Sequence, residues 1–270
     1  MSSSYLEKII EVKKLEVADL RKKFSLSALN DLISVASPVR PFLGSIERRL
    51  ENGLPAIIAE IKKASPSRGL ISEKFNPEFV ARCYTGAGAT CLSVLTDGRF
   101  FQGDMADLVI ARQASGLPVL RKDFIVDRYQ LLEARASGAD CVLLIVAALP
   151  KALLLELELE ALSLGMSVLS EVHSRLELET ALEMKTKLIG INNRDLNSFV
   201  TDISTSIHLQ KLIPPERIVI AESGILDPTD IVRLTDCGIY TFLIGEAFMR
   251  AADPGEELLR FFPQNRRFKR

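Results

Sequence analysis

Residues 56–62 read Ala-Ile-Ile-Ala-Glu-Ile-Lys, a short apolar run that ends on charged side chains where a soluble domain usually places a turn. Side chains alternate between the two faces of a strand, so Ile58, Glu60 and Lys62 share one face. Ionisable groups on a core face are costly unless they converge on a ligand or on one another. This stretch therefore predicts a buried strand whose carboxyl end carries chemistry.

Four further apolar runs end in the same way, at residues 117–120, 166–169, 188–191 and 218–221. The charged, amide or hydroxyl residues that follow them in chain order are Arg121, Lys122, Glu171, Asn192, Asn193, Arg194, Glu222 and Ser223. We call these five strand ends the polar mouth, because their order predicts that they meet at one site.

The spacing of strand and helix signals predicts an α/β protein with a closed (β/α)₈ (TIM) barrel. Strand-like runs centre near residues 58, 93, 119, 143, 168, 190, 219 and 243, and helical stretches separate them. Several helices begin with a capping residue and a proline, at Asn76-Pro77, Asp227-Pro228 and Asp253-Pro254. A doubly wound sheet is less favoured, because residues 63–69 after the first strand do not form a GxGxxG turn.

The chain is expected to form one domain over residues 1–270, with extensions at both ends of the barrel. Residues 1–50 contain no strand signal but two amphipathic pieces, near residues 6–20 and 42–50, which predict additional N-terminal helices. Residues 263–270 form a basic C-terminal tail.

Composition excludes several function classes. The net charge is −1 with no block of one sign, so no nucleic-acid surface is expected. Four scattered cysteines and two histidines provide no usual metal or redox site. The N-terminus does not read as a signal peptide and the most apolar run, residues 141–149, is too short to span a bilayer. We therefore expect a cytoplasmic protein that does not bind membranes.

The loops after the strands offer binding groups. Gly224 and Gly245 follow the seventh and eighth strands, where barrels often bind phosphate, although both could be ordinary turns. Phe101 and Phe124 follow the second and third strands and could form the wall for a planar substrate, or simply pack the loops.

Lysines and carboxylates of the polar mouth are the candidate acids and bases. Lys62 and Lys122 are candidate proton donors or anion-binding groups, and the candidate bases are Glu60, Glu171 and Glu222. Two alternatives remain at this point: a structural salt-bridge network, and a Schiff-base lysine. His173 lies beside a capping serine and is expected to make local hydrogen bonds, and His208 to lie on the surface.

The motifs together resemble those of the indole-3-glycerol phosphate synthase family of tryptophan biosynthesis. The resemblance runs over residues 40 to 250 and is carried by residues 58–69, 92–97, 100–103, 120–125, 129–130, 170–173, 190–196 and 221–225. It implies the conversion of 1-(2-carboxyphenylamino)-1-deoxyribulose 5-phosphate to indole-3-glycerol phosphate by ring closure, decarboxylation and dehydration. It implies no metal and no organic cofactor.

The resemblance also implies residue roles. Lys122 would be the general acid of ring closure, Glu171 the general base or acid of dehydration, and Lys62 the group that holds the anthranilate carboxylate. Other catalytic matches are Glu60, Asn192, Glu222 and Ser223. The phosphate matches are Ser65, Gly224, Gly245 and Glu246, and the remaining substrate contacts are Phe101, Phe124 and Arg194.

One position departs from the family pattern. Some relatives have serine where this chain has Glu246, so only the backbone N–H of Glu246 is expected at the phosphate. Its carboxylate is expected to point away, because like charges repel.

Two rival functions are a phosphate-binding barrel that acts as a Schiff-base aldolase or sugar-phosphate isomerase, and a barrel kept only as a scaffold. Borohydride would trap an imine on Lys62 or Lys122 in the first. Four charged strand-end residues, Glu60, Lys62, Lys122 and Glu171, argue against the second. The expected partner is a phosphorylated small molecule, and association with other tryptophan-pathway enzymes stays open.

We predict that chelators leave turnover unchanged, because the strand ends lack a cluster of histidine, cysteine and carboxylate ligands. The measurement is the rate of indole-3-glycerol phosphate formation before and after dialysis against EDTA. A loss that a divalent ion restores would contradict this prediction.

Overall fold

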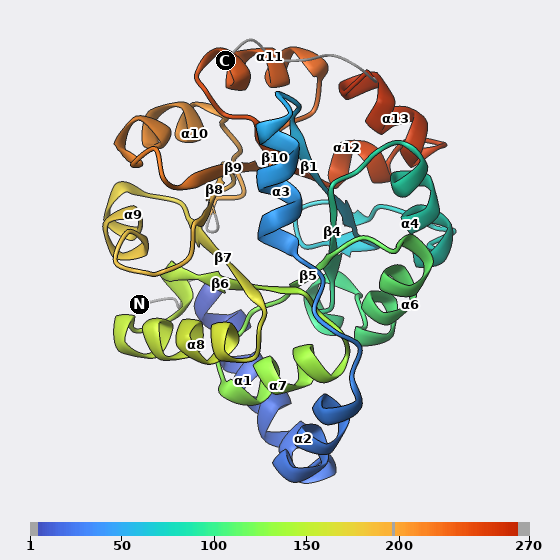
Figure 1. The fold of residues 1–270 in the computed structure, drawn as a ribbon, viewed down its shortest axis with the longest axis vertical. Coiled ribbons are helices and arrows are strands. Elements are labelled where there is room, and N and C mark those ends of the chain that lie inside the picture. The colour runs from blue at the N-terminus through green and yellow to red at the C-terminus, as the bar shows by residue number, and fades with distance from the viewer. Residues whose placement is uncertain (1–4, 196–197, 264–270) are drawn as a thin grey trace.

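The computed structural model describes residues 5–195 and 198–263, and eight parallel strands within them close into a barrel (Figure 1). The predicted fold class is thereby confirmed, whereas the expected tail lies, from residue 264 on, outside the described residues. The strands follow the order β1-β10-β9-β8-β7-β6-β5-β4 around the ring. Their bounds are β1 Ala56–Ile61, β4 Cys91–Leu95, β5 Val119–Lys122, β6 Cys141–Ile145, β7 Ser167–Val172, β8 Leu188–Asn192, β9 Ile218–Glu222 and β10 Thr241–Ile244.

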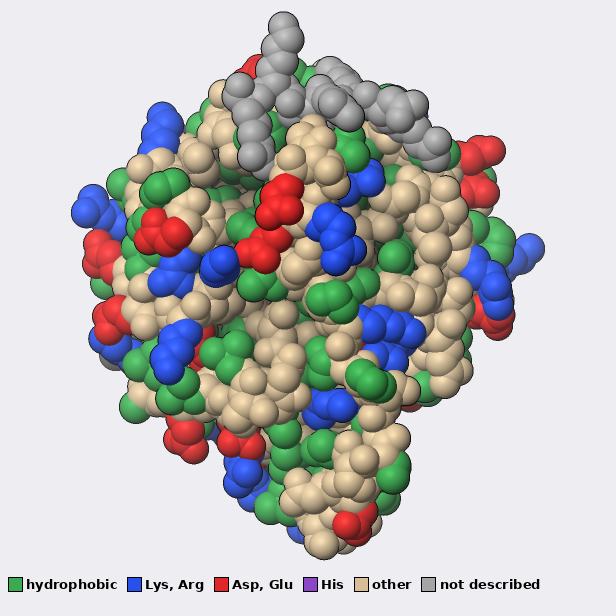
Figure 2. All heavy atoms as spheres, in the orientation of Figure 1, with side chains coloured by type: hydrophobic (Ala, Val, Ile, Leu, Met, Phe, Trp, Pro, Cys, Tyr) green, Lys and Arg blue, Asp and Glu red, His purple; other side chains and the backbone are tan. Residues whose placement is uncertain are grey.

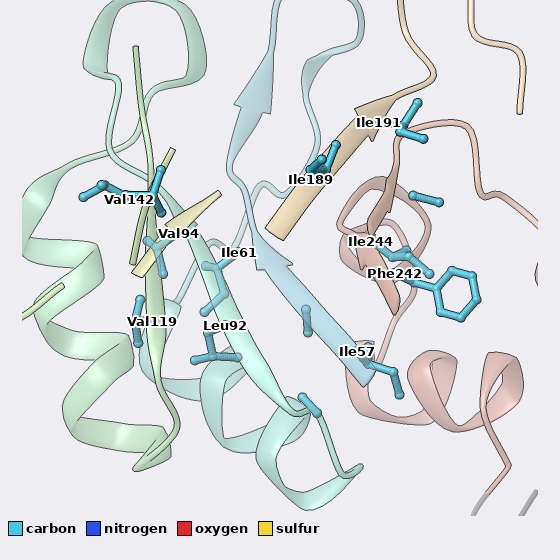
Figure 3. Packing of buried hydrophobic residues seen from close by; sticks show 14 of the residues in the cluster. Ile57, Ile61, Leu92, Val94, Val119, Val142, Ile189, Ile191, Phe242 and Ile244 are labelled. Carbon is cyan, nitrogen blue, oxygen red and sulfur yellow. The ribbon is translucent and has the colours of Figure 1, made fainter. Parts of the chain in front are cut away.

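Alternation along the strands separates two apolar layers, one outside and one inside the barrel. Outward side chains such as Ile57, Ile61 and Phe242 pack beneath the surrounding helices (Figure 3). Inward side chains such as Ile58 and Leu120 fill the lumen. Glu60 follows Ile58 on the inner face, so the alternation predicted from the sequence delivers this carboxylate to the end of the lumen.

Helices surround the barrel and begin at capping residues, as predicted. The side chains of Asn76, Asp227 and Asp253 each accept a hydrogen bond from a backbone N–H of the first turn. A short antiparallel pair, β2 Ala64–Ser65 and β3 Gly69–Leu70, folds the loop after β1 and was not predicted. The helices that follow β1 are α4 Pro77–Gly86, α5 Gly98–Phe101, α6 Met105–Ser115, α7 Arg128–Ala136, η1 Val146–Ala148, α8 Lys151–Ser163, α9 Arg175–Ala181, α10 Ser204–Leu209, η2 Gln210–Leu212, α11 Pro228–Asp236, α12 Glu246–Met249 and α13 Pro254–Phe261.

Three helices precede the barrel, one more than the two predicted: α1 Tyr5–Lys23, α2 Leu26–Val35 and α3 Phe42–Glu51. The missed helix is α2, which begins at the N-cap Ser25 and forms the projection at the bottom of Figure 1. Of its residues only Leu29 is buried. The signals that could have found it are the capping serine and the helical spacing of Leu26, Leu29 and Ile33.

The helix α3 lies across the near end of the barrel in Figure 1. Phe42 and Ile46 have no exposed surface and belong to the same apolar cluster as the lumen residues. The N-terminal helix α3 therefore closes this end of the barrel, and its buried side chains belong to the core.

The helix α1 is fastened by a lysine that is almost fully buried. Lys13 is 4% exposed, and its Nζ lies 2.7 Å from Oδ2 of Asp97 and 3.0 Å from Oδ1 of Asp123. Burial alone would raise the pKa of Asp123, but Arg121 and Lys13 lower it to about 2. The cluster of Lys13, Asp97, Asp123 and Arg121, which we call the anchor cluster, thus joins α1 to the loops after β4 and β5.

Surface composition agrees with the near-zero net charge. Acidic and basic side chains are interspersed over the face seen in Figure 2. Among the helices formed by residues 5–195 and 198–263, none has both the length and the apolar character needed to cross a membrane.

We predict that Lys13→Met destabilises the protein, because it removes the cation that faces two buried carboxylates. Loss of one partner of a buried ion pair costs about 3 kcal/mol or more. The measurement is the free energy of unfolding in urea. The matched control is Lys14→Met on the exposed side of the same helix, which should change this free energy by less than about 0.5 kcal/mol. Equal effects of the two substitutions would refute the role of the anchor cluster.

Candidate active site

All the residues predicted for the site line one cavity at the carboxyl ends of the strands. It encloses about 1130 Å³, including space open to solvent. The predicted residues among its lining are Glu60, Lys62, Ser65, Phe101, Lys122, Phe124, Glu171, Asn192, Arg194, Glu222, Ser223, Gly224, Gly245 and Glu246. The polar mouth is therefore a single site in the fold, except that Arg121 and Asn193 do not line the cavity.

Lys122 lies at the centre of this cavity. Its Nζ is 2.9 Å from Oε2 of Glu171 and 2.7 Å from Oε2 of Glu222. The three side chains come from β5, β7 and β9, so both ion pairs reach across the lumen. Glu171 also accepts a hydrogen bond from Nδ2 of Asn192, at 3.2 Å.

The two carboxylates that share Lys122 are not equivalent. Burial disfavours the charge of Glu171, but Lys122 and His173 outweigh it and hold the pKa of this carboxyl well below its usual range. Burial and the charge of Glu171 raise the pKa of Glu222 to about 7, although Lys122 opposes the rise. The pKa of Lys122 itself is raised, because its carboxylate neighbours overcome the effect of burial. The site thus holds an ionised carboxylate, an ammonium group and a carboxyl that titrates near neutrality.

Two glycines make room for the carboxylates. A Cβ on Gly190 would overlap Oε1 of Glu222, and a Cβ on Gly245 would overlap Oε1 of Glu60. Gly190 lies within β8, where a glycine weakens a strand unless another group must approach the backbone closely. Glu60 in turn accepts a hydrogen bond from Nζ of Lys62. These contacts explain why small residues face the lumen beside charged ones.

Ser223 and Gly224 form a strained turn after β9. Both have positive φ, at 60° for Ser223 and 72° for Gly224, and non-glycine residues rarely adopt this conformation. The buried Asn193 supports the turn, since its Nδ2 donates to the backbone carbonyls of Glu222 and Ser223 at 3.0 and 3.1 Å. The strain therefore lies in a segment that lines the cavity.

The surroundings of Glu246 differ from the expectation that its carboxylate points away from the site. Glu246 is 9% exposed and belongs to the cavity lining. Its carboxylate lies 2.8 Å from Nε of Arg68 and 3.1 Å from Nη2 of Arg194. Two arginines therefore neutralise the charge, and repulsion of an anionic ligand does not require the side chain to leave the cavity.

Aromatic and aliphatic side chains form one wall of the cavity. The rings of Phe101 and Phe124 lie 6.1 Å apart, tilted by 40°. Sequence reasoning missed that α1 contributes Tyr5, Leu6 and Ile9 to the same lining. The apolar spacing of Leu6 and Ile9 predicted a helix but gave no signal for what this helix covers.

His173 has its expected local contacts and one contact more. It makes the expected local contacts with Glu177, but its ring is in addition 3.4 Å from Oε1 of Glu171. His208 is exposed, as expected.

The arrangement favours proton transfer over covalent chemistry. An ammonium group held by two carboxylates is a proton donor and a poor nucleophile, because a Schiff base needs the neutral amine. In the described part of the chain no group of three or more histidine, cysteine, aspartate and glutamate side chains has the arrangement to hold a metal ion.

The chain is similar to known proteins in sequence and in fold. Residues 6–261 match the family model described as "Indole-3-glycerol phosphate synthase". Proteins of that name from Burkholderia ambifaria AMMD and Burkholderia cenocepacia HI2424 are each 53% identical to this chain over 260 residues, covering 96% of it and 99% of the relative. Among solved structures, tryptophan synthase subunit alpha from Legionella pneumophila has a TM-score of 0.60 at 13% identity, covering 82% of this chain and 96% of its own. The last similarity concerns the fold alone.

We predict that Gly190→Ala lowers turnover by on the order of a hundredfold, because the added methyl group displaces Glu222 from Lys122. The measurement is kcat together with the thermal midpoint of unfolding. Gly86→Ala is the control, since an added Cβ there meets nothing within 4 Å. Near-normal kcat in Gly190→Ala would show that the position of Glu222 does not matter.

Proposed function

The chain belongs to the indole-3-glycerol phosphate synthase family, and from this premise we propose how its residues divide the chemistry. Enzymes of this family are carboxy-lyases of tryptophan biosynthesis, and this chain is an enzyme of that class. The reaction closes the ring of 1-(2-carboxyphenylamino)-1-deoxyribulose 5-phosphate onto its ketone and then releases carbon dioxide and water. The observation that supports our assignment of roles best is the placement of Lys122 between Glu171 and Glu222.

Lys122 is the general acid of ring closure. When the ring carbon attacks the ketone, negative charge develops on the ketone oxygen, and a positioned donor lowers the barrier by protonating it. The two carboxylate contacts of Lys122 keep it an ammonium group, as this role requires. Glu222 lies at hydrogen-bond distance and titrates near neutrality, so it can return the proton that Lys122 gives up.

Glu171 is the general base or acid of dehydration. In its resting form it is ionised and can accept a proton first, and the protonated carboxyl can then deliver a proton to the leaving hydroxyl. Asn192 holds the second oxygen of this carboxylate through Nδ2. The proposed roles of Lys122 and Glu171 thus belong to successive steps on one bound molecule.

Binding is shared between the two ends of the substrate. Lys62 holds the anthranilate carboxylate, and Phe101 and Phe124 contact the ring. Ser65 and the backbone at Gly224, Gly245 and Glu246 receive the phosphate, and Arg194 completes the set of substrate contacts. The lining of one cavity by all of these residues supports the assignment.

We also propose a binding partner and a location for the enzyme. Its partner is a small phosphorylated molecule, and we infer no nucleic acid or membrane partner. A cytoplasmic location and an association with other tryptophan-pathway enzymes belong to the same proposal. Cell fractionation tests the first and co-purification tests the second.

The competing activity is Schiff-base chemistry at Lys62 or Lys122. The contacts of Lys122 disfavour it, because both of its carboxylate neighbours stabilise the protonated amine. Incubation with the substrate and borohydride should leave the protein mass unchanged, whereas an imine would be trapped as a stable adduct.

We predict that Lys122→Ala lowers turnover by roughly two to four orders of magnitude, the usual effect of losing a positioned acid. Substrate binding should persist, because the proposed contacts with phosphate and ring do not involve Lys122. The measurement is the fluorescence change that accompanies product formation, with Lys211→Ala as an exposed control. If Lys122→Ala lost affinity alone, Lys62 would become the candidate acid.

Glu171→Gln should also retain binding but stop at a later step, because an amide keeps the shape of the side chain and cannot carry the proton. A cyclised intermediate should accumulate in a single turnover of this variant and not in Lys122→Ala. If the cyclised intermediate accumulated in neither variant, Glu171 would act before ring closure or not at all.

A further inference from the structure

The ring of His173 lies between two carboxylates at the end of β7. Its Nε2 is 3.4 Å from Oε1 of Glu171, and its Nδ1 is 3.0 Å from Oε2 of Glu177 on α9. Glu177 is itself fixed, since it accepts hydrogen bonds from the backbone N–H of His173 at 2.8 Å and from Oγ of Ser174 at 2.9 Å. The carboxylate of Glu177, which does not line the cavity, therefore orients the imidazole.

Contact with the carboxylates of Glu171 and Glu177 favours the charged form of the His173 ring. A neutral imidazole has one N–H, so one of its nitrogens would direct a lone pair at a carboxylate oxygen. The imidazolium form has two N–H groups and presents positive charge to both neighbours, as a hydrogen bond from Nδ1 to Glu177 and as an ion pair between Nε2 and Glu171. Burial alone would lower the pKa of His173, but Glu171 and Glu177 raise it to about 10.

The carboxylates of the site outnumber the ammonium groups that pair with them. Glu171 and Glu222 share one ammonium group, that of Lys122, and Glu60 is a third carboxylate, which pairs with Lys62. The remaining neighbour of Glu171, Asn192, is uncharged. His173 contacts Glu171 and not Glu222, so it breaks the symmetry between the two carboxylates.

Glu171 and Glu222 together take up one proton near neutrality, and the surroundings of Glu222 indicate that this proton resides on Glu222. Its Oε1 is buried and has no hydrogen-bond partner among the described residues. A carboxylate oxygen without a donor is the better place for a proton, because a buried charge without partners is costly.

We propose that His173, oriented by Glu177, is a positioning residue that keeps Glu171 ionised and leaves the shared proton on Glu222. This inference rests on the proposed role of Glu171 and adds to it the group that prepares this carboxylate as a base. His173 does not line the cavity, so it acts through Glu171 and does not touch the substrate.

The charge of His173 can be measured without any catalysis. The sequence has two histidines, His173 and the exposed His208, so histidine-labelled protein gives the ring-nitrogen signals of only two imidazoles in nitrogen NMR, and His208→Gln assigns them. We expect His173 to carry protons on both nitrogens at pH 8. A neutral ring at that pH would overturn the proposal, even if every variant failed to fold.

The pH dependence of turnover supplies the second test. In His173→Gln the positive charge beside Glu171 is lost, so the proton that the pair of Glu171 and Glu222 takes up near neutrality no longer stays on Glu222 and resides partly on Glu171. The ratio of kcat at pH 6 to kcat at pH 8 should therefore fall relative to the unmodified enzyme, by about twofold where the two carboxylates share this proton equally. Glu177→Gln should shift the ratio in the same direction by less, because the imidazolium keeps its contact with Glu171.

Arg175→Gln is the matched control. Arg175 is an exposed cation two residues from His173 that pairs with Glu179 at 3.2 Å, so the substitution removes the same charge without touching Glu171. The ratio should stay unchanged there. Equal losses of kcat at both pH values in His173→Gln would assign it a structural role only and overturn the proposal. If instead Glu171→Gln kept full turnover, the role of Glu171 would fail while the NMR signal of a charged His173 persisted, so the two failures are distinguishable.

Discussion

The ammonium group of Lys122 pairs with carboxylates from two other strands of the barrel, and the organisation of the carboxyl end of the barrel depends on this contact. Lys122 belongs to β5 and Glu222 to β9, which lie on opposite sides of the ring of strands. A buried carboxylate left without its partner costs several kcal/mol. The ion pairs therefore form only when the barrel is closed and the carboxyl ends of these strands lie at the same height along its axis. Closure of the barrel and assembly of the site are consequently one event.

Local signals in the sequence were sufficient for the barrel and for most of the strand-end residues that line its cavity. The eight strands were predictable because apolar runs and capping residues are local patterns, and the inner face was predictable because alternation carries Glu60 and Lys62 to the same side as Ile58. The pair β2–β3 was not found, because strands of two residues have almost no periodicity. Helix α2 was missed although it has a capping serine and apolar residues at helical spacing. The resemblance to a family added residue roles, which periodicity cannot supply.

Contacts between distant segments account for most of what the sequence did not reveal. Lys13 meets Asp97 and Asp123 only because α1 folds back over the barrel, and nothing near Lys13 in the chain indicates a buried partner. Arg68 reaches Glu246 in the same way from another loop. The ring of His173 is close to Glu171 in sequence, yet only the structure distinguishes a contact with it from an ordinary capping interaction.

The helix α3 has a consequence for the order of folding during synthesis. Phe42 and Ile46 share their apolar cluster with Leu120, Leu188 and Leu243, so their partners are distributed over almost the whole chain. The strands β1 and β4, which pack on α3, are made soon after it, but the cluster is complete only when β10 leaves the ribosome. One of the first helices to be synthesised is thus among the last to complete its apolar surroundings, and a slow or interrupted translation leaves part of them open to aggregation for longer.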